Sequence, residues 1–197
     1  MFKRILLVAV WCLGFLGNAN AGLATSSTWN SMYPDVAGVQ FNQNSFNGVT
    51  IGLGAHAYKN GVLLPNDGVS TFYAPTGQYL GNAPADGRAN WSFDFFVNAG
   101  TYCQSCLRVL LQMDADPSAN ADLRDFGKQG LQLPVVGDSW NLEMDFLEGL
   151  NGPFDPNANG TYDFVLSVGA YDANSSPLKL YNMTNFGGTV SVFAPGV

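Results

Sequence analysis

The chain has 197 residues, of which 47% are hydrophobic and only 12% are charged, so it does not have the composition of a disordered chain. Its 23 Gly and 14 Phe favour strands and turns over exposed helices. The formal net charge of −7 disfavours contact with nucleic-acid phosphates and anionic lipid headgroups, because no basic cluster offsets it. We therefore expect no nucleic-acid partner.

Residues 1–21 have the pattern of a removable export signal. Lys3 and Arg4 form a positive region, an apolar stretch follows, and Ala19 and Ala21 place small residues where a signal peptidase cleaves. The apolar stretch is too short for a bilayer core of about 30 Å, although an uncleaved N-terminal anchor is the alternative. We predict a signal peptide over 1–21 and a mature domain over 22–197, secreted or periplasmic, with no membrane anchor.

The first strand signals lie between residues 49 and 74. Residues 49–58 are predicted to form a strand, and the Asn-Gly pair in Lys59-Asn60-Gly61 is typical of a β-hairpin that returns over residues 62–64. Residues 69–74 predict a further strand. His56 is the only histidine of the chain, and we interpret it as an ordinary strand residue.

Four later segments alternate apolar and polar residues with period two, which is the pattern of half-buried strands. They run over residues 89–98, 106–113, 140–146 and 162–170. In the third segment we expect Leu142, Met144 and Phe146 to face the core and Glu143 and Asp145 to face outward. Shorter strands are expected over 178–181 and 189–193, with one helical turn near 119–126. About nine or ten strands and little helix predict an all-β fold, a single β-sandwich of jelly-roll or Ig-like type.

Cys103 and Cys106 form a Cys-x-x-Cys pair. Outside the cytoplasm, such a pair is a redox centre, half of a zinc site or a small structural loop. A zinc site needs two more ligands, and His56 is the only imidazole in the chain. A redox centre would place the first Cys at a helix N-terminus, whereas this motif lies between two strand-like segments. We therefore predict a Cys103–Cys106 disulfide that closes a turn.

The loop that precedes the strand at 162–170 has two interpretations. Its spacing up to Gly160 is that of the first half of an EF-hand calcium loop. The candidate calcium ligands are Asp155, Asn157, Asn159 and Asp163. The acid that should close such a loop is replaced by Leu166, so we favour a tyrosine corner, in which the Tyr162 hydroxyl bonds to upstream backbone. We expect no cofactor, with calcium as the alternative.

Five motifs follow one another in the chain: Asn90-Trp91-Ser92-Phe93-Asp94-Phe95, Met113-Asp114-Ala115-Asp116-Pro117, Asp138-Ser139-Trp140-Asn141-Leu142, Phe154-Asp155-Pro156-Asn157 and Gly160-Thr161-Tyr162-Asp163-Phe164. Their order resembles the exported β-sandwich proteins of the PEP-CTERM sorting-domain type in Gram-negative bacteria. The resemblance covers about residues 68–194. It implies a non-catalytic protein associated with exopolysaccharide or the extracellular matrix. The sorting tail of that family is not matched by residues 193–197, so we expect release into the periplasm or medium.

A catalytic alternative rests on Glu143, Asp145 and Glu148, in the pattern Glu-x-Asp-x-x-Glu. This pattern resembles the active-site strand of laminarinase-like family 16 glycoside hydrolases. On a strand, Glu143 and Asp145 share one face, and a bulge after Phe146 would return Glu148 to it. The resemblance implies that Glu143 is the nucleophile and Glu148 the acid/base, with carboxyls about 5–5.5 Å apart. We favour the simpler interpretation, a polar outer strand face, and keep the hydrolase as runner-up.

A third hypothesis is a carbohydrate-binding module without hydrolysis. Sugar rings stack on exposed aromatic side chains, and four aromatic residues are candidates for such a platform. They are Trp29, Tyr79, Phe96 and Tyr171. Coplanar exposed rings would favour binding, whereas a cleft with carboxylates at its floor would favour the enzyme.

Overall fold

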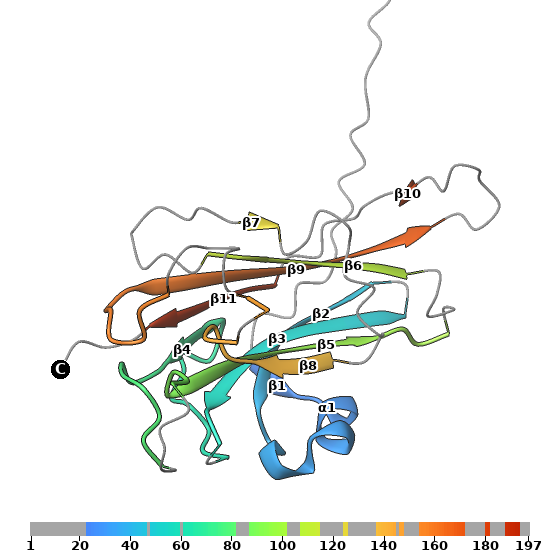
Figure 1. Cartoon of the computed structure of the whole chain (residues 1–197). Helices are drawn as coiled ribbons and strands as arrows, with labels where there is room; N and C mark the ends of the chain where they lie inside the picture. Colours follow the sequence, from blue (N-terminus) through green and yellow to red (C-terminus); the bar gives the residue numbers. More distant parts are fainter. Residues whose placement is uncertain are drawn as a thin grey trace, which may run out of the picture.

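The computed structural model describes residues 23–46, 48–59, 61–81, 87–101, 107–114, 124–125, 137–144, 146–147, 154–171, 180–181 and 188–193. Within these ranges the chain forms one short α-helix, one 3₁₀ turn and the strands of two sheets (Figure 1). The predicted all-β fold is confirmed. No helix in the described ranges is long and apolar enough to cross a membrane. The predicted signal peptide lies outside them.

The lower sheet in Figure 1, sheet A, is antiparallel throughout. Its strands, in spatial order, are β1 (Leu23–Thr25), β2 (Gln40–Phe46), β3 (Val49–Ala57), β5 (Trp91–Asn98) and β8 (Gly137–Trp140). The register of β3 against β5 places His56 opposite Ser92. The register of β5 against β8 places Asp94 opposite Ser139. Three strands thus bring these four polar residues to one region of the sheet.

The upper sheet, sheet B, contains the other long predicted strands. In spatial order its strands are β4 (Thr71–Tyr73), β11 (Gly188–Phe193), β9 (Thr161–Tyr171), β6 (Leu107–Met113) and β7 (Arg124–Asp125), and β10 (Leu180–Tyr181) also pairs with β9. β4 and β11 are parallel, and the remaining pairs are antiparallel. Strands predicted over 106–113, 162–170 and 189–193 are therefore present within one or two residues of their predicted ends.

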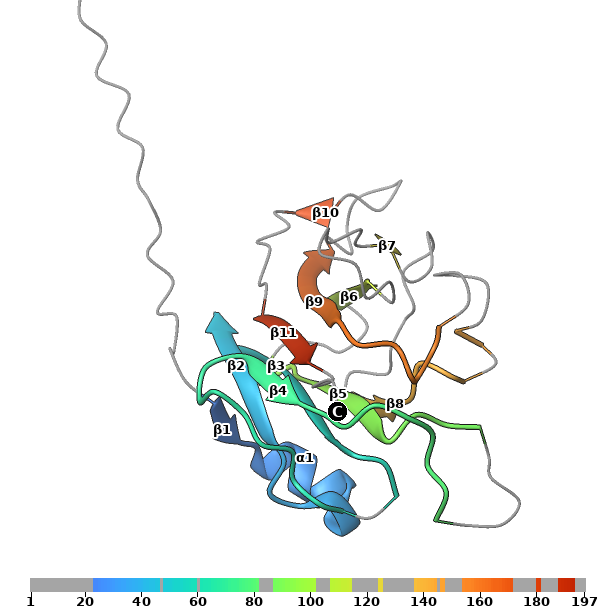
Figure 2. The same ribbon diagram turned by 90° about the vertical axis from the view of Figure 1, so that its left-hand side faces the viewer.

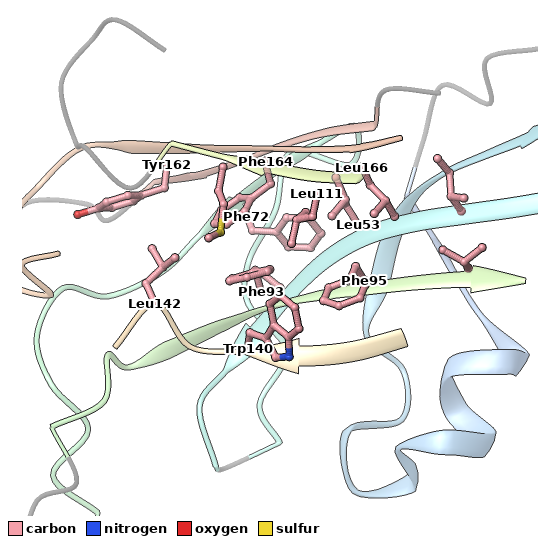
Figure 3. Close-up of a cluster of buried hydrophobic side chains, with 14 of the residues drawn as sticks. Leu53, Phe72, Phe93, Phe95, Leu111, Trp140, Leu142, Tyr162, Phe164 and Leu166 are labelled. Atoms are coloured by element: carbon pink, nitrogen blue, oxygen red, sulfur yellow. The ribbon is translucent and has the colours of Figure 1, made fainter. Parts of the chain in front are cut away.

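Sheets A and B face each other across a shared aromatic core (Figure 3). Phe93 of β5 stacks on Phe164 of β9 with ring centroids 4.5 Å apart, and Trp140 meets Phe95 edge-on at 4.8 Å. Alternation explains this core, because every second side chain of a strand points to the same face. The jelly-roll or Ig-like connectivity of the whole mature chain stays a prediction.

A second, smaller hydrophobic cluster covers the outer face of sheet A, on the side where Figure 2 shows α1 beside the sheet. It lies under α1 (Ser27–Met32) and η1 (Pro34–Val36), and Ser26 Oγ caps α1 by accepting a hydrogen bond from Trp29 N at 3.2 Å. Trp29 and Phe96 are 0% and 1% exposed here. Phe96 lies directly over Gly52, where a Cβ atom would clash with its ring. The expectation that Trp29 and Phe96 form an exposed platform is therefore wrong.

The strand predicted over 140–146 ends at Trp140, and a turn follows. The cause is Asn141, which is 0% exposed and whose Nδ2 donates to the carbonyls of Ala89 and Trp91 at 3.0 and 2.8 Å. Its Oδ1 accepts from the backbone of Ala89 and Glu143. The hydrogen bonds of the Asn141 side chain replace the next backbone hydrogen bonds of the sheet. The strand therefore ends here, and the chain turns. Phe146 is consequently 53% exposed rather than part of the core.

Three smaller predictions have mixed outcomes. The hairpin after β3 returns only as a bridge between His56 and Leu63, so residues 62–64 do not form a strand. Of the predicted helical turn near 119–126, the described residues 124–125 belong to β7 instead. Cys103 and Cys106 lie outside the described residues, and their disulfide stays a prediction.

Candidate functional site

An open pocket of about 390 Å³ lies beside the outer face of sheet A, where η1 meets the ends of β3 and β5. Its buried polar lining comes from His56 and Ser92, with Ser139 beside them. Val36 and Met144 belong to its apolar lining. We call this the His56 pocket. Its described lining contains none of the residues that the sequence marked as catalytic or calcium-binding candidates.

The buried side of the His56 pocket contains a histidine–carboxylate pair. His56 Nδ1 and Asp94 Oδ2 are 2.7 Å apart and share a hydrogen bond, and the two residues are 5% and 0% exposed. Both point to the outer face, because Phe93 and Phe95 on either side of Asp94 point into the core. In the sequence, the signal for this pair is Asp94 in the middle of an aromatic strand. A carboxyl group at such a position needs a hydrogen-bonding partner when its face of the sheet is covered.

Burial raises the pKa of Asp94, although the charge and the hydrogen bond of His56 and the nearby Ser139 hydroxyl act to lower it. The neighbouring Asp138 raises it further. Asp94 Oδ1 is buried and has no hydrogen-bond partner at normal geometry in the described part of the chain. The desolvated carboxyl therefore holds a proton more readily than an exposed one does.

Tyr33 forms part of the pocket wall and is held on two sides. Its hydroxyl lies 3.2 Å from both the Gly137 carbonyl and Asp138 Oδ1 and donates to them, and its ring stacks on Trp29 at 4.4 Å. Burial, followed by the Asp138 charge, raises the pKa of Tyr33 to about 12. Asp138 Oδ1 also accepts from Ser139 N at 2.8 Å. This wall is thus preorganised, with Tyr33 a neutral phenol.

Two tyrosines lie together next to the pocket. Tyr58, which lines it, meets Tyr79 edge-on with centroids 5.5 Å apart. Lys59 Nζ lies 5.2 Å from the centre of the Tyr58 ring, a cation–π distance. The two rings are nearly perpendicular, so together they do not form a coplanar surface. The side chain of Tyr171 lies outside the described residues.

Glu143, the described acid of the hydrolase hypothesis, does not lie on a strand. Glu143 lies in the turn after β8, where its backbone carbonyl accepts a hydrogen bond from the Arg88 guanidinium and its N–H donates to Asn141 Oδ1. Asp145 and Glu148 lie outside the described residues. The argument that strand geometry aligns Glu143 with Asp145 is therefore wrong, because the strand has already ended at Trp140.

The calcium candidates lie in the loop before β9 and near the start of that strand, at residues 155–163. Asp155 Oδ1 accepts from both N and Nδ2 of Asn157, at 2.9 and 3.2 Å, which makes a local turn. Asn159 is exposed, and Asp163 lies on β9 between the inward-facing Tyr162 and Phe164. The described ranges contain no group of three or more His, Cys, Asp or Glu arranged to hold a metal ion.

The predicted tyrosine corner is represented by one hydrogen bond. Tyr162 is 1% exposed, and its hydroxyl donates to the Ala158 carbonyl at 3.4 Å. Tyr162→Phe should lower the free energy of unfolding by about 1 kcal/mol, because the partly buried Ala158 carbonyl loses this hydrogen bond. Chemical denaturation measures this loss. A chelator should leave the melting temperature of the wild type unchanged, and a clear drop would instead favour calcium.

The His56 pocket thus combines a buried titratable pair, two serine hydroxyls and an aromatic wall in one cavity. Buried hydrogen-bonding groups within an otherwise apolar cavity are the usual features of a small-molecule site. No family model, curated protein or solved structure matches this chain.

Proposed function

We propose that this chain is an exported, non-catalytic β-sandwich protein that binds polysaccharide of the extracellular matrix in the His56 pocket. The observation that carries the proposal is the pocket itself, with its buried polar groups on rigid strands. Its volume of about 390 Å³ is within the usual range for small ligands. One end of a glycan chain is the occupant that agrees with the proposed export.

The chemistry of the lining supports a hydroxyl-rich ligand. Ser92 and Ser139 each offer a hydroxyl that donates and accepts, and the aromatic wall at Tyr33 offers apolar contact to the C–H face of a sugar. Because these side chains are fixed by strand pairing and stacking, little entropy is lost when they bind a ligand.

The placement of the carboxyls favours binding over hydrolysis. Glycosidases use two carboxyl groups that flank the scissile bond. Asp94 is fully buried behind His56, and Asp138 is occupied by Tyr33 and by the Ser139 backbone. Among the described residues that line the pocket, Asp35 is the one carboxyl. Purified protein should therefore release no reducing sugar from laminarin, mixed-linkage glucan, agarose or carrageenan.

A glycan array tests the proposal, run with the secreted, processed protein in the presence and absence of calcium. We expect binding to at least one class of polysaccharide. Ser92→Ala should weaken it about tenfold through loss of one hydrogen-bonding group, and Ser45→Ala on the exposed part of β2 should not. An array with no bound glycan, or binding insensitive to Ser92→Ala, would refute the proposed site.

A further inference from the structure

We infer that His56 presents a protonated Nε2 to the pocket and that the pocket therefore selects the acetamido group of an N-acetylated sugar. The inference rests on the proposed function for its class of ligand. Its first part, the proton on Nε2, depends only on the geometry of the His56–Asp94 pair.

The free nitrogen of His56 faces the pocket. Nδ1 is occupied by Asp94 Oδ2 at 2.7 Å, and Nε2 has no hydrogen bond within the described part of the chain. In the same part, Trp29 Nε1 and Asp94 Oδ1 are the buried side-chain polar atoms that lack a partner. Nε2 is not among these buried atoms, so it is accessible from the cavity that His56 lines.

The proton count of the pair determines what Nε2 can do. With one proton the pair carries a net negative charge, and Nδ1–H bonds to the carboxylate while Nε2 is an acceptor. With two protons the pair is neutral overall. It is then either an imidazolium beside a carboxylate or an imidazole beside a carboxylic acid that donates to Nδ1. In both of these forms Nε2 carries a hydrogen and donates into the pocket.

The surroundings favour the two-proton pair. Asp94 is 0% exposed, and its Oδ1 lacks the partner that would help to hold a buried carboxylate ionised. A proton on Oδ1 itself would leave a buried O–H without an acceptor at normal geometry. Sharing the proton along the short Nδ1–Oδ2 contact avoids that cost, so the second proton lies on the His56 side of the carboxyl.

The charged groups around the pair do not favour an anionic ligand. Asp35, Tyr58 and Lys59 line the described part of the pocket, and the charges of Asp35 and Lys59 are opposite. Asp138 lies outside that lining and accepts a hydrogen bond from Tyr33. The lining therefore offers no excess positive charge that would favour a uronate over a neutral acceptor.

The rest of the lining discriminates among neutral acceptors. Met32, Pro34, Val36 and Met144 give the cavity apolar surface next to the His56 donor. An acetamido group has a carbonyl oxygen to accept from Nε2–H and a methyl group to contact those side chains. A plain hydroxyl offers the first contact without the second. An N-acetylhexosamine therefore fits better than the corresponding hexose.

The proton is tested directly by ¹⁵N nuclear magnetic resonance of the untagged protein. His56 is the only histidine, so the imidazole signals need no assignment. We expect Nε2 to have the ¹⁵N shift of a protonated ring nitrogen at neutral pH. An unprotonated Nε2 at neutral pH would overturn the inference whether or not any glycan binds.

Calorimetry with N-acetylglucosamine and glucose tests the ligand class. N-acetylglucosamine should bind about tenfold more tightly or better, because only its acetamido group offers both the carbonyl acceptor and the methyl contact. His56→Asn keeps an amide to face Asp94 but has no group at the Nε2 position, so it should abolish the preference. His56→Gln, which restores an N–H there, should recover part of it. Pocket binding of glucose without this preference would overturn the inference and leave the proposed function standing.

Discussion

His56→Leu should lower the free energy of unfolding at neutral pH by about 3–5 kcal/mol, because it leaves the Asp94 carboxyl buried without its partner. The carboxyl is 0% exposed, and its other oxygen already lacks a hydrogen bond in the described chain. The loss should become smaller in acid. Below the ordinary pKa of 3.8 the carboxyl is protonated in both the folded and the unfolded chain.

The sign of this pH dependence follows from the pKa of Asp94, which burial raises and His56 acts to lower, so removing His56 raises it further. Above the unfolded value the folded variant then keeps its proton to higher pH than the folded wild type, and its stability falls more steeply as pH rises. The matched control is the double variant His56→Leu/Asp94→Leu, which removes both polar groups. It should recover most of the lost stability while abolishing glycan binding, because apolar replacements of a buried pair cost little. Urea denaturation of the two variants over pH measures the effect, and equal losses at all pH values would contradict it.

Phe164→Ala should cost about 3–5 kcal/mol in unfolding free energy, because it opens a cavity between the two sheets. Phe164 is 0% exposed, stacks on Phe93 at 4.5 Å and meets Trp91 at 6.4 Å. No nearby loop of the described core can collapse into the space, since the neighbours lie on paired strands. Thermal denaturation should show a correspondingly large drop in melting temperature.

Phe146→Ala is the informative comparison for Phe164→Ala. The alternating pattern of residues 140–146 places Phe146 in the core, where its truncation would cost as much. In the structure it is 53% exposed and touches Trp140 edge-on at 5.1 Å, so we expect a loss of less than about 1 kcal/mol. A loss of several kcal/mol at Phe146 would support the longer strand and contradict the turn after Trp140.

The difference between these two phenylalanines shows how far local pattern predicts this fold. β5 and β9 were predicted within about two residues of their ends, because a long alternating segment is rarely anything but a strand with one buried face. The turn after Trp140 was not predicted, because Asn141 ends the strand through hydrogen bonds to the carbonyls of Ala89 and Trp91. These two residues lie about fifty positions earlier in the chain. α1 was missed as well, since its six residues are too few to show a helical period.

For the candidate site, both members of the pair were visible in the sequence but their contact was not. His56 and Asp94 are separated by 38 residues and meet only through the antiparallel register of β3 and β5. A shift of that register by one residue would send either side chain to the core face. Spacing along the chain alone made Glu143 a catalytic candidate and Asp155 a calcium candidate. In the structure both residues form hydrogen bonds within local turns.

The sequence by itself determined the class of the fold and the inner faces of its main strands, because side-chain alternation depends only on neighbours along the chain. Only the tertiary structure decided which outer face is covered and which polar residues lie beneath that cover. In the sequence Trp29 and Phe96 are candidates for exposed aromatics, but in the structure they pack together under α1, with Phe96 over Gly52. In the sequence His56 is an ordinary strand residue, and only its contact with the buried Asp94 marks it as part of a site. Burial and partnership arise from contacts between distant segments, and no local pattern contains them.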